Sequence, residues 1–114
     1  MEKNPGIFLE HILDSIEAIE TYAAGQTLEM FLRAGKEQDA VVRRFEIIGE
    51  AVKNIPDDFK NKYPEVPWSK AAGMRNMLIH EYFTVDIPAV WDTIQDNLPT
   101  LKTQLKNILL KEQK

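Results

Sequence analysis

Residues 86–108 read DIPAVWDTIQDNLPTLKTQLKNI and hold the longest regular apolar pattern in this chain of 114 residues. Its large apolar side chains are separated by alternating steps of four and three, which places them on one stripe of a helix: Ile87, Trp91, Ile94, Leu98, Leu101, Leu105 and Ile108. Asp86 is a good N-cap and Pro88 suits the first turn, whereas Pro99 should kink or break the helix. The stretch therefore predicts helix that packs through one apolar stripe.

Two segments upstream show the same periodicity. The first should begin at Pro5 and end near Gly25, and the second should span residues 37–54 and end at Pro56. Their apolar stripes are Leu9, Ile12, Ile16, Ile19 and Ala23 in the first, and Val41, Phe45, Ile48, Val52 and Ile55 in the second. A short helical turn capped by Thr27 is expected over residues 27–34, and residues 57–67 are expected to be a connector.

No stretch alternates with a period of two, so no sheet is expected. The length suits one domain over residues 1–114, and we predict an all-α fold, an antiparallel bundle of four to five helices. Gly49 lies inside the helix of residues 37–54, where glycine costs about 1 kcal/mol relative to alanine. Close approach of another helix would explain a glycine there. The final residues, 111–114, are expected to fray.

Composition narrows the function. The chain has no cysteine, which excludes disulfides, thiolate metal sites and a cysteine nucleophile. The net charge of −4 argues against a protein that coats duplex nucleic acid non-specifically. No apolar run approaches the roughly 20 residues that span a bilayer, and the first residues do not resemble a signal peptide. We expect a cytoplasmic protein with no membrane partner.

Residues 68–83, WSKAAGMRNMLIHEYF, carry the residues with chemical potential. Read as one continuous helix, they place Arg75 at the centre of an apolar face, where an unpaired guanidinium is costly. Asn76 and His80 share a neighbouring polar stripe. Arg75 and His80 lie about 140° apart around the helix, which favours a site that combines two copies of the chain.

Two interpretations of Arg75 and His80 stay open on the residues alone. Arginine can hold a phosphate bidentately, and histidine can move a proton to or from a ribose hydroxyl near neutral pH. Together they could cleave RNA without a metal. The structural alternative, commoner for such a pair, is that Arg75 forms an ion pair with a buried carboxylate such as Glu46 or Glu50, and that His80 caps its helix.

The segment from Arg75 to Tyr82 resembles the R-x4-H-x-Y motif of the HEPN superfamily, and the chain is most similar to HepT-like toxins. The resemblance extends over roughly residues 7–110. It includes the blocks FEIIGEA at residues 45–51 and YPEVPW at residues 63–68, the pair Val90-Trp91, and the leucine-rich last helix.

The resemblance implies a HEPN-like homodimer whose composite active site lies at the dimer interface and cleaves RNA without a metal or cofactor. Arg75 and His80 would be catalytic, and Asn76 would occupy the polar position after the arginine. The chain would be the toxin of a toxin–antitoxin pair, with an MntA-like minimal nucleotidyltransferase as antitoxin. Tyr82 would accept adenylyl groups from that partner. The alternative is a non-catalytic subunit that binds nucleotides or a partner for the nucleotidyltransferase.

Other chemistry is less well supported. Glu46, Glu50 and His80 could suggest a metal site, but the chain has no Glu-x-x-His pair and only two histidines, so we expect no metal. Arg43 and Arg44 form either a solvated face or an extension of a phosphate-binding surface. Besides these, His11 is expected at the edge of the core, and Trp68 and Trp91 are expected to be core or interface anchors rather than base-stacking platforms.

Overall fold

The computed structural model describes residues 4–75 and 86–113, and the regular structure of these residues is entirely helical. The helices are α1 (Pro5–Ala23), α2 (Leu28–Leu32), α3 (Gly35–Asn54), α4 (Asp57–Lys62), α5 (Trp68–Ala72), α7 (Ile87–Asp96) and α8 (Leu98–Glu112). The predicted all-α class is confirmed for this part of the chain.

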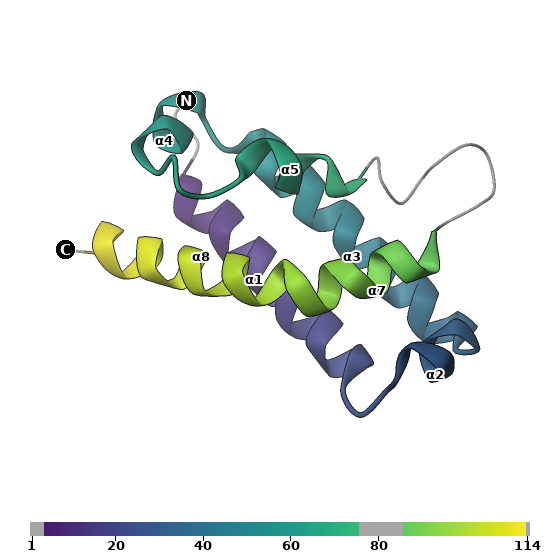
Figure 1. The fold of residues 1–114 in the computed structure, drawn as a ribbon. Coiled ribbons are helices and arrows are strands. Elements are labelled where there is room, and N and C mark those ends of the chain that lie inside the picture. The colour runs from purple at the N-terminus through teal and green to yellow at the C-terminus, as the bar shows by residue number, and fades with distance from the viewer. Residues whose placement is uncertain (1–3, 76–85, 114) are drawn as a thin grey trace.

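Helices α1 and α3 form the central pair. They run in opposite directions and are joined by a turn at Gly25, whose φ of 75° suits glycine, and by the short α2 (Figure 1). Every residue of the two predicted apolar stripes is buried. Thr27 caps α2 by accepting a hydrogen bond from the Met30 amide, as predicted. The sequence pattern therefore sets the core of this pair.

Helices α7 and α8 lie across the central pair in Figure 1. The chain breaks between them at Asn97, and Pro99 falls in the first turn of α8, as its position predicted. The Asp86 side chain caps α7 by accepting from the Ala89 amide. Five of the seven seam residues are buried, and an ion pair of 2.7 Å between Lys102 Nζ and Glu20 Oε1 links α8 to α1.

Residues 57–67 are not a simple connector, because they contain the short helix α4. The prediction overlooked the charge order of this segment. Asp57 and Asp58 occupy the first turn and Lys60 and Lys62 the last, which matches the helix dipole at both ends. Since none of its residues is fully buried, α4 has no apolar stripe that periodicity could detect.

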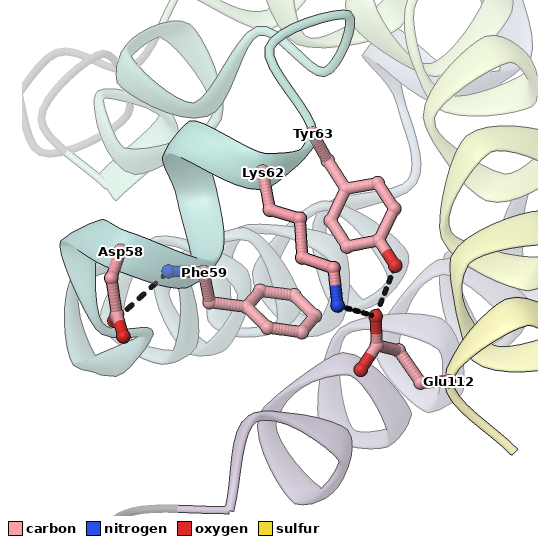
Figure 2. A network of polar contacts seen from close by, with 5 residues as sticks. All are labelled: Asp58, Phe59, Lys62, Tyr63 and Glu112. Atoms are coloured by element: carbon pink, nitrogen blue, oxygen red, sulfur yellow. Dashed lines mark hydrogen bonds and ion pairs between the residues drawn. The ribbon is translucent and has the colours of Figure 1, made fainter.

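The end of the chain is also more ordered than predicted, because α8 continues to Glu112. Lys62 Nζ lies 2.9 Å from the Glu112 carboxylate, and the Tyr63 hydroxyl donates to the same oxygen (Figure 2). The hydrogen bond from Tyr63 is the largest cause that lowers the pKa of the Glu112 carboxyl below its ordinary value. The hydrogen bond from Lys62 is the next largest cause. The expectation of fraying was wrong at Glu112, because it ignored partners about fifty residues away.

No helix in the described ranges has both the length and the apolar composition that a bilayer crossing requires.

Candidate active site

Trp68 fixes the start of the segment that leads to Arg75. Its ring is buried, and its indole N–H donates to the carbonyls of Tyr63, at 2.9 Å, and Lys60, at 3.1 Å. This satisfies the one polar atom of the side chain. Trp68 is thus a core anchor, as predicted, and Trp91 has a similar role because its ring packs on Phe31 with centroids 5.3 Å apart.

The continuous helix predicted from Trp68 onwards is interrupted. Helix α5 ends at Ala72, and Gly73 forms its C-cap before a helical conformation returns at Met74 and Arg75. The Gly73 backbone nevertheless stays right-handed helical, with φ −70° and ψ −12°, and its amide donates to the Ser69 carbonyl at 3.0 Å. The Arg75 side chain is 39% exposed rather than centred on a buried apolar face, whereas Met74 is buried.

Gly49 brings α3 against the backbone of this segment. A Cβ added at Gly49 would lie 2.7 Å from Arg75 Cβ, 3.0 Å from the Ala72 carbonyl oxygen and 3.1 Å from the Arg75 amide nitrogen. The first distance is shorter than real Cβ contacts, and the other two are tight contacts with backbone atoms. The close approach expected at this glycine is confirmed, and the partner is the segment that carries Arg75.

Glu50, the next residue of α3, forms an ion pair with Arg75 through its Oε1 and the guanidinium Nη1. Of the two carboxylates considered from the sequence, Glu50 is therefore the partner and not Glu46. The expectation that the carboxylate is buried was wrong, because the Glu50 side chain is 52% exposed. A pair this exposed contributes only about 0–1 kcal/mol to stability.

A groove of about 250 Å³ lies beside the ion pair, between α1 and α3. Its lining includes Glu50 together with Arg43, Glu46 and the exposed His11, whose ring meets Phe8 edge-on. Arg43 thus reaches the same surface as the partner of Arg75, and Arg44 is not part of this lining. Whether Arg43 extends a phosphate-binding surface stays a prediction.

A second cavity, of about 430 Å³, lies between the end of α5 and the junction of α7 with α8. Gly73 and Met74 line it, but Arg75 does not. Lys70 is the single cation among its lining residues. Of these two pockets, the groove between α1 and α3 is lined by an arginine, Arg43, and the cavity beside α7 and α8 is lined by none.

Comparison with known proteins identifies the family. A family model described as ribonuclease HepT-like matches residues 12–108, which is most of the chain. The chain belongs to the HepT-like family. No solved structure matches it.

Several curated proteins are similar to this chain in sequence. The chain is 44% identical over 108 residues to a "Probable ribonuclease HepT" of Thermococcus cleftensis, covering 95% of this chain and 98% of that protein. It is 46% identical over 110 residues to a candidate RNase of Caldanaerobacter subterraneus subsp. tengcongensis, covering 96% and 98%. A Methanocaldococcus jannaschii protein, named as a gamma-glutamylcyclotransferase and candidate RNase, is 45% identical over 109 residues. The match covers 96% of this chain but 49% of that relative's length.

Of the site residues that the family resemblance implies, the described part of this HepT-like chain contains Arg75. Asn76, His80 and Tyr82 lie outside the described residues, and the assignments of all four site residues, Arg75 included, stay predictions. Within residues 4–75 and 86–113, no group of three or more His, Asp or Glu side chains is placed to hold a metal ion. The sequence left open whether Glu46 or Glu50 pairs with Arg75. Gly49, next to Glu50, was the signal for Glu50.

Proposed function

We propose that this protein is a metal-independent endoribonuclease, the toxin of a toxin–antitoxin pair, with an active site shared between two copies of the chain. The observation that supports the proposal is the setting of Arg75. This residue begins the family motif, is anchored to α3 at Gly49 and Glu50, and still exposes 39% of its side chain. A fixed, accessible guanidinium is what binding of a phosphodiester requires.

The proposed reaction uses the ribose next to the scissile phosphate. His80 takes the proton of the 2′-hydroxyl, and the resulting oxygen attacks phosphorus. The P–O5′ bond breaks, the 5′-oxygen leaves with a proton, and the other product ends in a 2′,3′-cyclic phosphate. Arg75 stabilises the charge that develops on the non-bridging oxygens. No step needs a metal or a redox partner.

RNA cleavage in the presence of EDTA tests this mechanism. We expect wild-type protein to cut RNA with chelator present and to leave 2′,3′-cyclic phosphate ends. A strict need for added magnesium would contradict the mechanism. Binding of RNA or nucleotides without any cleavage would favour the alternative, a non-catalytic subunit of a nucleotidyltransferase.

Mixing two inactive variants tests the composite site. In a dimer of Arg75→Ala with His80→Ala, a shared site regains one intact pair, whereas a site within one chain regains none. Random exchange makes half of the dimers mixed, each with one intact site of two, so about a quarter of wild-type activity should return. No recovery, or a monomer by light scattering at micromolar concentration, would contradict the shared site.

Tyr82 is the proposed point of control by an MntA-like nucleotidyltransferase. Its phenol oxygen would attack the α-phosphorus of ATP, pyrophosphate would leave, and a base would take the phenol proton. The added phosphate places negative charge near the motif arginine and excludes the RNA phosphate. Intact-mass measurement with partner and ATP should show added AMP, and Tyr82→Phe should remain active but escape silencing. Modification at another residue would contradict this assignment.

A further inference from the structure

Glu50 is fixed relative to Arg75 by more than the charge between them. Gly49 lets α3 approach the backbone of residues 72–75 closely, so Glu50, the next residue of α3, lies beside the segment that carries Arg75. An exposed ion pair normally samples several geometries, because both side chains are long and surrounded by water. Here the close approach at Gly49 brings α3 next to the segment that carries Arg75. This narrows the range of geometries open to the Glu50–Arg75 ion pair.

The ion pair leaves most of the guanidinium able to bind another anion. An arginine has five N–H donors in one plane, and the contact with Glu50 Oε1 is made by Nη1. The side chain is 39% exposed, so solvent reaches part of this plane. A phosphate can therefore approach the guanidinium while Glu50 stays bound.

We propose that Glu50 is a positioning residue for RNA cleavage, which orients the Arg75 guanidinium toward the scissile phosphate without touching the RNA itself. The inference rests on the proposed ribonuclease function. An arginine held in advance loses less rotamer freedom on reaching the transition state, and a displaced one loses alignment with the developing charge. Glu50 thus acts on the chemical step more than on substrate binding.

The negative charge of Glu50 gives this role a kinetic signature. A carboxylate beside the phosphate site repels RNA in the ground state, so removing the charge should not weaken binding. The positioning role therefore predicts a lower kcat with an unchanged or lower KM. If Glu50 instead competed with the RNA phosphate for Arg75, removing the Glu50 carboxylate would raise kcat/KM. If the ion pair were purely structural, its removal would change stability alone.

The experiment compares Glu50→Ala and Glu50→Gln with wild type, using the full chain and one RNA oligonucleotide. We expect kcat to fall about tenfold or more in Glu50→Ala and less in Glu50→Gln, whose amide oxygen can still accept from Arg75. The matched control is Glu46→Gln, one turn away on α3 and in the same groove, with kcat within about twofold of wild type.

Two further readouts separate positioning from other roles. Fluorescence anisotropy with a fully 2′-O-methylated RNA, which cannot be cleaved through its 2′-oxygen, should show equal or tighter binding to Glu50→Ala. The pH profile of kcat/KM should keep its shape, because Glu50 carries no proton in the reaction. If the Glu50 variants lose the fall in kcat/KM at low pH that wild type shows, Glu50 is a general base and the proposal is overturned.

The outcomes distinguish this inference from the function on which it rests. If wild type does not cleave RNA at all, the ribonuclease function fails and the positioning role fails with it. If wild type cleaves and Glu50→Ala keeps the wild-type kcat, the ribonuclease stands and the positioning role is wrong. Weaker binding of the methylated RNA by Glu50→Ala would also overturn it, since that result would place Glu50 in substrate binding.

Discussion

Two of the polar contacts that join distant parts of this chain differ in what lies beneath the charges. The pair of Glu50 and Arg75 sits on a backbone contact at Gly49, where not even a Cβ would fit. The contact of Lys62 and Tyr63 with Glu112 joins α4 to the last turn of α8 (Figure 2). The first therefore joins two segments whose backbones are in close contact, whereas the second joins side chains near a helix end.

The difference indicates that similar surface charges serve different purposes. Exposed pairs contribute little to stability in general, so the Glu50–Arg75 contact is better explained by the geometry that it maintains. The Glu112 contact holds no residue of the proposed active site and closes the bundle near both chain ends. Substitutions in the two regions should therefore separate loss of cleavage from loss of stability.

The largest expected effect is on cleavage. Arg75→Ala should lower kcat about 100-fold or more, because it removes the charge that we propose stabilises the transition state. The free energy of unfolding should change by only about 0–1 kcal/mol, as for other exposed pairs. Cleavage assays and urea unfolding measure the two quantities. Lys62→Ala is the control from the other contact and should cleave normally. Near-normal cleavage by Arg75→Ala would remove the catalytic assignment.

A smaller effect on stability is expected at the backbone contact. Gly49→Ala places a carbon 2.7 Å from Arg75 Cβ and 3.0 Å from a carbonyl oxygen, so α3 or the segment after α5 must move. Overpacking costs about 1–3 kcal/mol, and the better helix propensity of alanine recovers up to about 1. We expect a net loss of about 1–2 kcal/mol together with slower cleavage.

Gly35→Ala is the matched control for this substitution, because it lies on the same helix and a Cβ there meets nothing within 4 Å. Its stability should stay within about 0.5 kcal/mol of wild type in urea unfolding, and its cleavage should be unchanged. If Gly49→Ala matches Gly35→Ala in both measurements, the close approach is not tight in solution.

The sequence predicted what depends on local pattern. The stripes of α1 and α3, the Thr27 and Asp86 caps and the break before Pro99 all follow from spacing and from side-chain chemistry within a few residues. Gly49 belongs in the same group, because its cost inside a helix indicated a neighbour. The sequence could not name that neighbour, since the contact joins residues about 25 positions apart.

The features that were missed depend on tertiary contacts or on short polar elements. Helix α4 has no apolar stripe, and the order of its charges is a weaker signal than periodicity. The exposure of Arg75 depends on its contact with α3, because its ion pair with Glu50 joins residues 25 positions apart. Glu112 looked like a fraying end because its partners, Lys62 and Tyr63, are distant in sequence. Local reasoning therefore placed the core correctly and misjudged the exposure of Arg75 and of its partner Glu50.

The smallest expected effect concerns Glu112. Bonding to Tyr63 and Lys62 lowers the pKa of this carboxyl in the folded protein below its ordinary value of 4.5. A lowered carboxyl pKa contributes stability above the unfolded-state value, and that contribution is lost as the pH falls through the folded-state value. Glu112→Gln should therefore lower Tm slightly at pH 7, and its difference from wild type should shrink as the solution is acidified below pH 4.5.

Glu10→Gln is the control for this prediction, because it removes an exposed carboxylate from α1 and should leave the Tm at pH 7 close to that of wild type. Cleavage by Glu112→Gln at pH 7 should equal that of wild type, since the contact lies away from Arg75. A Tm difference that grows on acidification would reverse the sign of the linkage and show that the carboxylate is unfavourable where it sits. A loss of cleavage without a loss of stability would instead couple the end of α8 to the active site, and the separation between the two contacts would no longer hold.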